Sequence, residues 1–337
     1  MKFDKRTLLI FGLPVLMVYL IWGSYMVTSE SWVLFLRDWY MTVTMIFGSF
    51  IAGASSEGGG AIAYPVMTLG FQIAPDVARN FSLAIQSIGM TAATLWIVAK
   101  RITIEKTYLW LAMSGGTLGI ILASFYIVPL VSPAYAKMVF VSFWLSFGIA
   151  LFVINHIRKR DTVTTLSSLN RRQKTELFFI GFLGGILSAI FGNGIDICTF
   201  AFVTLKYNLS EKIATPTSVI LMASNAVVGT LLHFFVIQDM QQEAIDFWLV
   251  CIPVVMLGAP FGAYFVNKIK RLAIAYLLYL IIIVQFIAAI FIIQPSAILI
   301  GVSALTFIGG MVIFFVLTDG FRESHPPGQN EDSKFNR

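Results

Sequence analysis

The sequence predicts an all-α polytopic membrane protein. Of its 337 residues, 58% are hydrophobic and only 12% are charged, whereas soluble proteins average about a quarter charged residues. Several apolar runs reach the roughly 20 residues that a helix needs to cross a bilayer. They are too long and too uniformly apolar for the alternating strands of a membrane β-barrel. The formal charge of +6 is therefore attributed to basic cytoplasmic loops rather than to nucleic-acid binding.

The first apolar run follows a basic start and is too long for the apolar core of a signal peptide, so we expect a retained helix. Seven further runs have the length and apolar character of full spans. The eight expected spans are residues 7–28, 79–100, 107–131, 135–157, 212–237, 244–267, 271–293 and 297–318.

Two other apolar runs, residues 41–71 and 177–206, are interrupted by glycines. As a single helix, a run of about 30 residues would be roughly 45 Å long, against about 30 Å of hydrocarbon. We expect each to form a re-entrant helical hairpin that enters and leaves on one side. This arrangement places most basic loops and both termini in the cytoplasm, as the positive-inside rule requires.

The two halves of the chain align with one another at a constant offset. The aligned pairs are Gly58 with Gly194, Ala78 with Ala214, Ser82 with Ser218, Thr94 with Thr230 and, after a longer loop, Gly115 and Gly119 with Gly258 and Gly262. Each repeat would hold one hairpin and three spans, and an odd number of crossings inverts the second repeat. Inverted repeats with discontinuous helices are typical of secondary transporters.

The expected organisation has six parts. They are an N-terminal helix and outer loop (1–40), a first membrane repeat (41–157), a basic cytoplasmic linker (158–176), a second repeat (177–293), a C-terminal transmembrane helix (294–320) and a polar cytoplasmic tail (321–337).

The two glycine-rich breaks are the candidate binding site. Glycine lets backbone amides approach a ligand closely, and a helix that starts after such a turn directs free N–H groups toward a bound anion. The alternative is that these glycines only permit tight packing. The proposed ligand contacts at the breaks are Ser55, Ser56, Gly58, Gly59, Gly60, Asn193 and Gly194.

Glu57 and Asp196 are the only carboxylates in the predicted hydrocarbon region. Removal from water favours the neutral form of a carboxyl group, so either residue is a candidate for proton coupling. Structural hydrogen bonding to loop amides and cation binding remain alternatives. Because ionised carboxylates would repel an anion, the hypothesis requires them to be protonated or to point toward the amides of their own hairpin.

The helix after each hairpin carries a second set of polar residues. Ligand contact and bonding to their own helix backbone are both open for these side chains. Arg79 lies beside the first hairpin and is a candidate for anion attraction at the outer mouth, with interfacial snorkelling as its alternative. The candidate contacts on these two helices are Ser82, Gln86, Thr217, Ser218 and Asn225.

No metal-spaced His/Cys cluster, phosphate-binding glycine loop or nucleophile elbow occurs in the sequence. We therefore expect no enzyme activity, no metal and no cofactor. His233 is the only histidine well inside a span and is interpreted as a packing residue.

The two breaks and the stretches that follow them resemble the TauE/SafE family of sulfite exporters. In the first half SEGGGAIAYP is followed by VARNFSL, and in the second GNGIDICTF is followed by IATPTSV. The resemblance covers residues 45–315. It implies transport of a small sulfur oxyanion or sulfonate across the bacterial cytoplasmic membrane.

The leading hypothesis is thus a secondary transporter of a small anion such as sulfite, a sulfonate or a similar organic anion, coupled to protons or to membrane potential. The alternatives are a passive anion channel and a membrane-embedded redox or receptor component for sulfur compounds. The expected partners are the anion, protons and the lipid bilayer, without nucleic acid.

Overall fold

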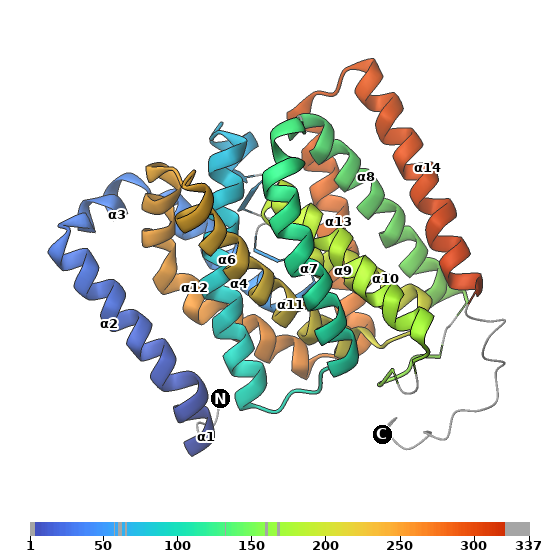
Figure 1. Ribbon diagram of the computed structural model, residues 1–337, viewed down its shortest axis with the longest axis horizontal. Coiled ribbons are helices and arrows are strands. Elements are labelled where there is room, and N and C mark those ends of the chain that lie inside the picture. Colours follow the sequence, from blue (N-terminus) through green and yellow to red (C-terminus); the bar gives the residue numbers. More distant parts are fainter. Residues whose placement is uncertain are drawn as a thin grey trace.

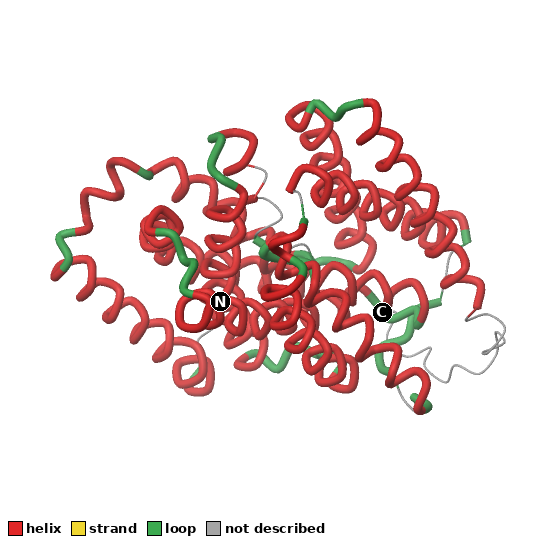
Figure 2. The backbone as a smooth tube through the Cα atoms, turned by 45° about the horizontal axis from the view of Figure 1, so that its top comes forward, coloured by secondary structure: helices red, strands yellow, loops and turns green. Residues whose placement is uncertain are grey.

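The structure is a computed structural model that describes residues 4–56, 58–59, 63–64, 66–131, 133–158, 161–166 and 169–320. Within these residues every regular element is helical, and nine helices are long and apolar enough to cross a membrane (Figure 1, Figure 2). The all-α polytopic class is confirmed. The ninth such helix, α9, belongs to the second broken run, which the sequence assigned to a hairpin.

The N-terminal helix lies at one edge of the molecule (Figure 1). Two aromatic side chains attach it to α12: Tyr19 donates to the Pro253 carbonyl at 2.6 Å, and Trp22 donates to the Leu249 carbonyl at 2.8 Å. Its segments are α1 (Lys5–Thr7), η1 (Leu8–Gly12) and α2 (Leu13–Thr28), followed by η2 (Ser31–Val33) and α3 (Leu34–Arg37).

The first broken run contains a helix that stops at the glycine-rich segment. α4 ends at Ala54, and Ser55 already has an extended backbone. Pro75 starts the long helix α6, where proline is well suited because the first helical N–H has no intrahelical partner. The elements of this half are α4 (Trp39–Ala54), η3 (Val66–Gly70), α6 (Pro75–Ala99), α7 (Lys106–Tyr126), η4 (Val128–Leu130), α8 (Pro133–Phe152) and η5 (Val153–Ile157).

The second broken run folds back on itself. The end of α10 lies beside the start of α9: Lys206 Nζ, at the end of α10, is 2.7 Å from Glu176 Oε2 in the first turns of α9. A capping box between Asn170 and Gln173 starts α9. The elements of this half are α9 (Arg171–Phe191), α10 (Ile195–Lys206), α11 (Glu211–Leu231), η6 (Leu232–Ile237), α12 (Gln242–Lys268), α13 (Arg271–Ile293) and α14 (Ala297–Gly320).

Glycines bring α7 and α9 into backbone contact. A Cβ placed on Gly119 would lie 2.1 Å from the Phe182 carbonyl oxygen, and one placed on Gly185 would lie 2.2 Å from the Gly116 carbonyl oxygen. No side chain fits at these positions, so the small residues are what allow the two helices to approach. We call this contact the α7–α9 seam.

A matching contact joins α4 to α12. A Cβ on Gly53 would lie 1.8 Å from the Ala259 carbonyl oxygen, and a Cβ on Gly262 would lie 2.1 Å from the Phe50 carbonyl oxygen. In this α4–α12 seam and in the α7–α9 seam, the helix before the break in one half packs on the glycine pair of the other half. These exchanged contacts are those expected of two related repeats, whose inverted orientation in a membrane remains a prediction.

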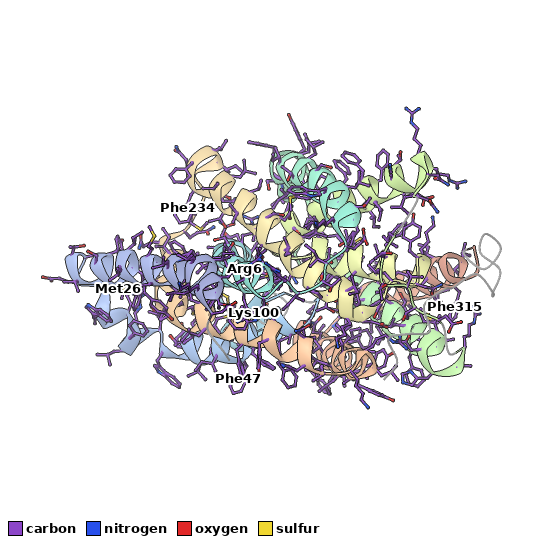
Figure 3. The ribbon with its side chains drawn as sticks, turned by 90° about the horizontal axis from the view of Figure 1, so that it is seen from below. Arg6, Met26, Phe47, Lys100, Phe234 and Phe315 are labelled. Atoms are coloured by element: carbon purple, nitrogen blue, oxygen red, sulfur yellow. The ribbon has the colours of Figure 1, made fainter. Side chains whose placement is uncertain are left out.

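Several charged residues lie together at one end of the helices. At this end Arg6 donates to the Val98 carbonyl at 3.1 Å, and Lys100 lies 3.6 Å from Asp4, close to Arg6 in Figure 3. At the same end the linker is bonded to the start of α7, because the Leu166 amide donates to Glu105 Oε2 at 3.0 Å. These groups belong to the side that the sequence assigned to the cytoplasm, an assignment that remains a prediction.

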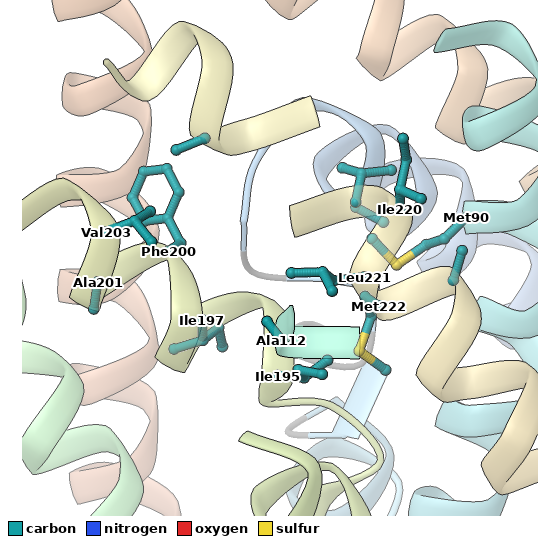
Figure 4. Close-up of a cluster of buried hydrophobic side chains, with 14 of the residues drawn as sticks. Met90, Ala112, Ile195, Ile197, Phe200, Ala201, Val203, Ile220, Leu221 and Met222 are labelled. Carbon is teal, nitrogen blue, oxygen red and sulfur yellow. The ribbon is translucent and has the colours of Figure 1, made fainter. Parts of the chain in front are cut away.

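At the centre α6 and α11 pack against each other between α7 and α12. The first residue of α10, Ile195, is buried there in an apolar cluster that includes Ala112 of α7 and Met222 of α11 (Figure 4). The start of α10 is thereby fixed in the middle of the helix bundle.

Candidate functional site

The second break is three residues long and depends on two glycines. Gly192 has φ +77° and Gly194 has φ +152°, values that side-chain-bearing residues rarely adopt. A Cβ on Gly192 would also lie 2.6 Å from the Ser82 Cβ and 2.7 Å from the Arg79 carbonyl oxygen. The break therefore requires glycine both for its backbone conformation and for its close approach to α6.

The amides at the start of α10 already have partners. Asp196 Oδ1 accepts from the Gly194 amide at 3.2 Å and from the Ile197 amide at 3.0 Å, while Ser188 Oγ accepts from the Ile195 amide at 3.0 Å. This is the orientation toward its own hairpin that the anion hypothesis allowed for Asp196. An anion at this helix start would have to reach amides that Asp196 and Ser188 now hold.

Two polar side chains of α6 hold the carbonyl group of Gly192. Gln86 Nε2 donates to it at 2.7 Å, and Ser82 Oγ donates to it at 3.1 Å. Gln86 Nε2 also lies 2.9 Å from Ser82 Oγ. Since the amide nitrogen of Gln86 is committed to this contact, its oxygen Oε1 has to point the other way.

Gln86 Oε1 points to the first break. Gly58 has φ +67°, and a Cβ placed on it would lie 2.5 Å from Gln86 Oε1 and 2.8 Å from Asp196 Oδ2. The two breaks, far apart in sequence, thus meet at Gln86 and Asp196. The neighbouring residues Glu57 and Gly60 lie outside the described residues.

Several buried polar atoms near this meeting point have no hydrogen-bond partner among the described residues. Asp196 is fully buried, Gln86 is 2% exposed and Asn225 is 1% exposed. Asn225 lies close to Ile195, because a Cβ on Gly116 would lie 2.1 Å from Ile195 Cδ1 and 3.3 Å from Asn225 Nδ2. The unpartnered atoms are Ser56 Oγ, Gln86 Oε1, Asp196 Oδ2, and both amide atoms of Asn225.

A small cavity adjoins the first break. It has a volume of about 10 Å³, and Gly59, Gln86 and Ser49 contribute to its lining. A cavity of this size holds about one water molecule, so a larger ligand requires the breaks to move apart.

Three of the predicted contact residues form hydrogen bonds with backbone groups. Thr217 Oγ1 accepts from the Glu105 amide at 3.0 Å and donates to the Ile213 carbonyl, and Ser218 donates to the Thr215 carbonyl. Ser55 donates to the Ile51 carbonyl of its own helix. These contacts are with backbone groups, whereas Asn193 is buried at the second break itself.

Arg79 is buried and paired. Its Nη2 lies 3.2 Å from Asp239 Oδ2, and its Nε donates to Asn80 Oδ1 at 3.0 Å. The Asp239 carboxylate also lies 2.6 Å from His233 Nδ1. Sequence reasoning did not find this cluster, because its members come from segments that are far apart along the chain.

Two residues that contact the Asp196 segment were also not predicted. Ser188 caps the start of α10, and Thr199 Oγ1 lies 2.6 Å from the Tyr108 hydroxyl. The spacing of Asp196 and Thr199, three residues on one helix, is a signal that could have identified Thr199. In the described part of the chain, no group of three or more His, Cys, Asp or Glu side chains is placed to hold a metal ion.

Comparison with known proteins identifies the family. The family described as Sulfite exporter TauE/SafE matches residues 40–291, well over half of the chain and including both breaks. No curated protein and no solved structure matches the chain significantly. The chain therefore belongs to the TauE/SafE sulfite exporter family and is a multi-pass membrane transporter.

Proposed function

We propose that this protein is a secondary carrier that moves a small anion, such as sulfite, a sulfonate or a similar organic anion, across the cytoplasmic membrane. In this proposal both termini are cytoplasmic and Asp196 carries a coupling proton. Family membership supports the substrate class. The binding site is placed where the two breaks meet.

The observation that carries the proposal is the contact of Gly58 in one break with Asp196 in the other. Discontinuous segments that meet inside a helix bundle are typical substrate sites of secondary transporters. The Ser56 hydroxyl and the Asn225 amide have no hydrogen-bond partner within the described part of the chain, and both can donate to an oxyanion without adding charge. A neutral site of this kind favours a small anion that arrives together with a proton.

The position of Asp196 supports the proposed proton coupling. Its Oδ2 and Gln86 Oε1 face the same point beside Gly58, and both oxygens lack a donor among the described residues. An ionised carboxylate can only accept hydrogen bonds, whereas a protonated one donates. A proton on Oδ2 therefore removes an unfavourable pairing of two acceptors and also removes the negative charge that would repel the anion.

Flux measurements in proteoliposomes test the proposal. Labelled sulfite, sulfonate and carboxylate panels are compared with and without a pH gradient. We expect sulfite or a sulfonate to accumulate when the gradient is imposed. In Asp196→Asn this accumulation should disappear while equilibrium exchange continues, because the site stays neutral but carries no exchangeable proton.

Asp246→Asn is the matched control, since Asp246 pairs with Arg37 away from the breaks and should retain gradient-driven accumulation. Absence of flux for every anion under every gradient would refute the carrier. If the labelled anion only equilibrated across the membrane and never accumulated, the protein would be a passive channel. Unchanged accumulation in Asp196→Asn would refute the assigned proton site.

A further inference from the structure

A buried charged cluster lies beside the second break but is not part of the proposed substrate site. It consists of Arg79 on α6, His233 on η6 and Asp239 in the loop that follows η6. Arg79 is 7% exposed and His233 is 1% exposed. Burying charged groups is costly unless they are paired, so the purpose of this cluster needs an explanation.

Asp239 connects the two basic residues. Its Oδ1 lies 2.6 Å from His233 Nδ1, and its Oδ2 lies 3.2 Å from Arg79 Nη2. Partial burial raises the pKa of Asp239, but the hydrogen bond and charge of His233 and the charge of Arg79 outweigh burial and lower it. The carboxylate is therefore ionised at neutral pH, and it can only accept hydrogen bonds.

This requirement determines the protonation of the imidazole. Because Asp239 accepts, Nδ1 of His233 must carry the hydrogen in either charge state. The other ring nitrogen, Nε2, is buried and has no hydrogen-bond partner among the described residues. An additional proton therefore binds at Nε2 and leaves the contact with Asp239 in place.

The loop that carries Asp239 is fastened to α6 by neutral contacts as well. Asn80 Nδ2 donates to the Asp239 carbonyl and to Gln241 Oε1, both at 2.9 Å. Gln241 Nε2 in turn donates to Asp76 Oδ2 at 2.8 Å. Since α6 belongs to the first half of the chain and this loop to the second, the contacts join the two halves. We call them the Asp239 lock.

The lock is one helical turn from the proposed substrate site. Arg79, Ser82 and Gln86 share a face of α6. Ser82 and Gln86 bind the Gly192 carbonyl, and Gly192 itself packs against the Arg79 carbonyl. The lock and the second break therefore contact the same face of α6, one turn apart.

We propose that His233 and Asp239 form a second proton-binding site, separate from Asp196, and that proton binding at His233 closes the Asp239 lock. The inference concerns how the two halves are held together and does not depend on which solute the carrier moves.

The charges around the site give the direction of the effect. His233 is paired with Asp239 from the loop, and Asp239 with Arg79 from the first half. Two further groups of the first half lie near this pair: Asp76, which accepts from Gln241, and the Tyr64 hydroxyl, which acts on Arg79. With neutral His233, the two carboxylates exceed the single cation Arg79. Protonation balances the charges and gives Asp239 a second cationic partner. Acidification should therefore close the lock.

Dipolar EPR spectroscopy on the full chain in lipid nanodiscs tests this directly. Spin labels are attached at Ala74→Cys and Gln238→Cys, two exposed positions on opposite sides of the lock. Cys198 and Cys251 are replaced by serine in this background. With native His233 we expect one narrow, short distance at pH 5.5 and a broader, longer distribution at pH 8.

His233→Gln keeps a donor toward Asp239 but cannot gain a proton, so its distribution should not change with pH. Asp239→Asn should give the broad distribution at both values. His156→Gln is the matched control, because His156 contacts Tyr276 on the exposed surface, and it should respond like the parent.

A pH response in His233→Gln equal to that of the parent, or no response in the parent, would overturn the proposal. Because the readout is a distance, it separates failure of the lock from failure of the proposed transport function.

Discussion

Replacing Gly58 with alanine tests whether the two breaks meet. Gly58 has φ +67°, and this backbone conformation costs a residue with a Cβ roughly 1–2 kcal/mol. The added methyl group would also lie 2.5 Å from Gln86 Oε1 and 2.8 Å from Asp196 Oδ2. Gln86 can withdraw only by giving up its contacts with Gly192 and Ser82.

Each hydrogen bond that Gln86 loses contributes about 0.5–1.5 kcal/mol. With two such bonds lost and the backbone term added, the expected loss of stability is roughly 2–5 kcal/mol. The assay compares thermal unfolding in detergent with anion exchange in proteoliposomes. We expect a clearly lower unfolding temperature and at least a tenfold loss of exchange, because both Gln86 and Asp196 are displaced.

Gly309→Ala is the matched control. Gly309 lies in α14, and a Cβ there meets no atom within 4 Å. The substitution should therefore leave stability unchanged or raise it by up to about 1 kcal/mol. If Gly58→Ala unfolded at the same temperature as Gly309→Ala and exchanged anions normally, the inference that the two breaks meet would be refuted.

Two further variants test single contacts. Ser188→Ala removes the acceptor of the buried Ile195 amide and should cost about 1–3 kcal/mol. Ser114→Ala, at an exposed serine that donates to the Leu111 carbonyl of its own helix, should be nearly neutral in the same unfolding assay. Asp239→Asn should destabilise the protein at pH 7 by roughly 1 kcal/mol, a value reduced by the partial exposure of Asp239. Because the pKa of Asp239 lies below its ordinary value of 3.8, this stabilisation is present above that pH and is lost as the pH falls through the lowered value. The two proteins should therefore converge in unfolding temperature once the pH falls below the lowered pKa of Asp239, and a difference that persisted there would contradict the ionic role of Asp239.

The membrane class and the positions of the helix breaks were accessible from the sequence. Long apolar runs and glycines inside them are local signals, and the structure places Gly58, Gly192 and Gly194 at positive φ. The alignment of Gly115 and Gly119 with Gly258 and Gly262 also pointed to real contacts, because these residues lie in the two seams. Periodicity and residue size were sufficient for this part of the prediction.

The partners of individual polar side chains were not accessible. Ser82 and Thr217 looked alike in the sequence, yet Ser82 binds the carbonyl of the second break, whereas Thr217 binds the amide of Glu105. Backbone groups carry no residue-specific signal, so nothing in the sequence distinguished these outcomes. Likewise the pairing of Arg79 with Asp239 depends on how two distant segments approach each other.

The exchanged seams have a consequence for how the protein is made. Helix α4 leaves the ribosome long before α12, and its glycine face can be covered only when α12 has been synthesised. Until then the face of α4 that packs on α12 is not covered by its partner helix. The same holds for the glycine face of α7 until α9 has been synthesised. Biogenesis of this transporter is therefore completed late, by the insertion of the second half. The two halves made as separate polypeptides should assemble only when both are present in the same membrane.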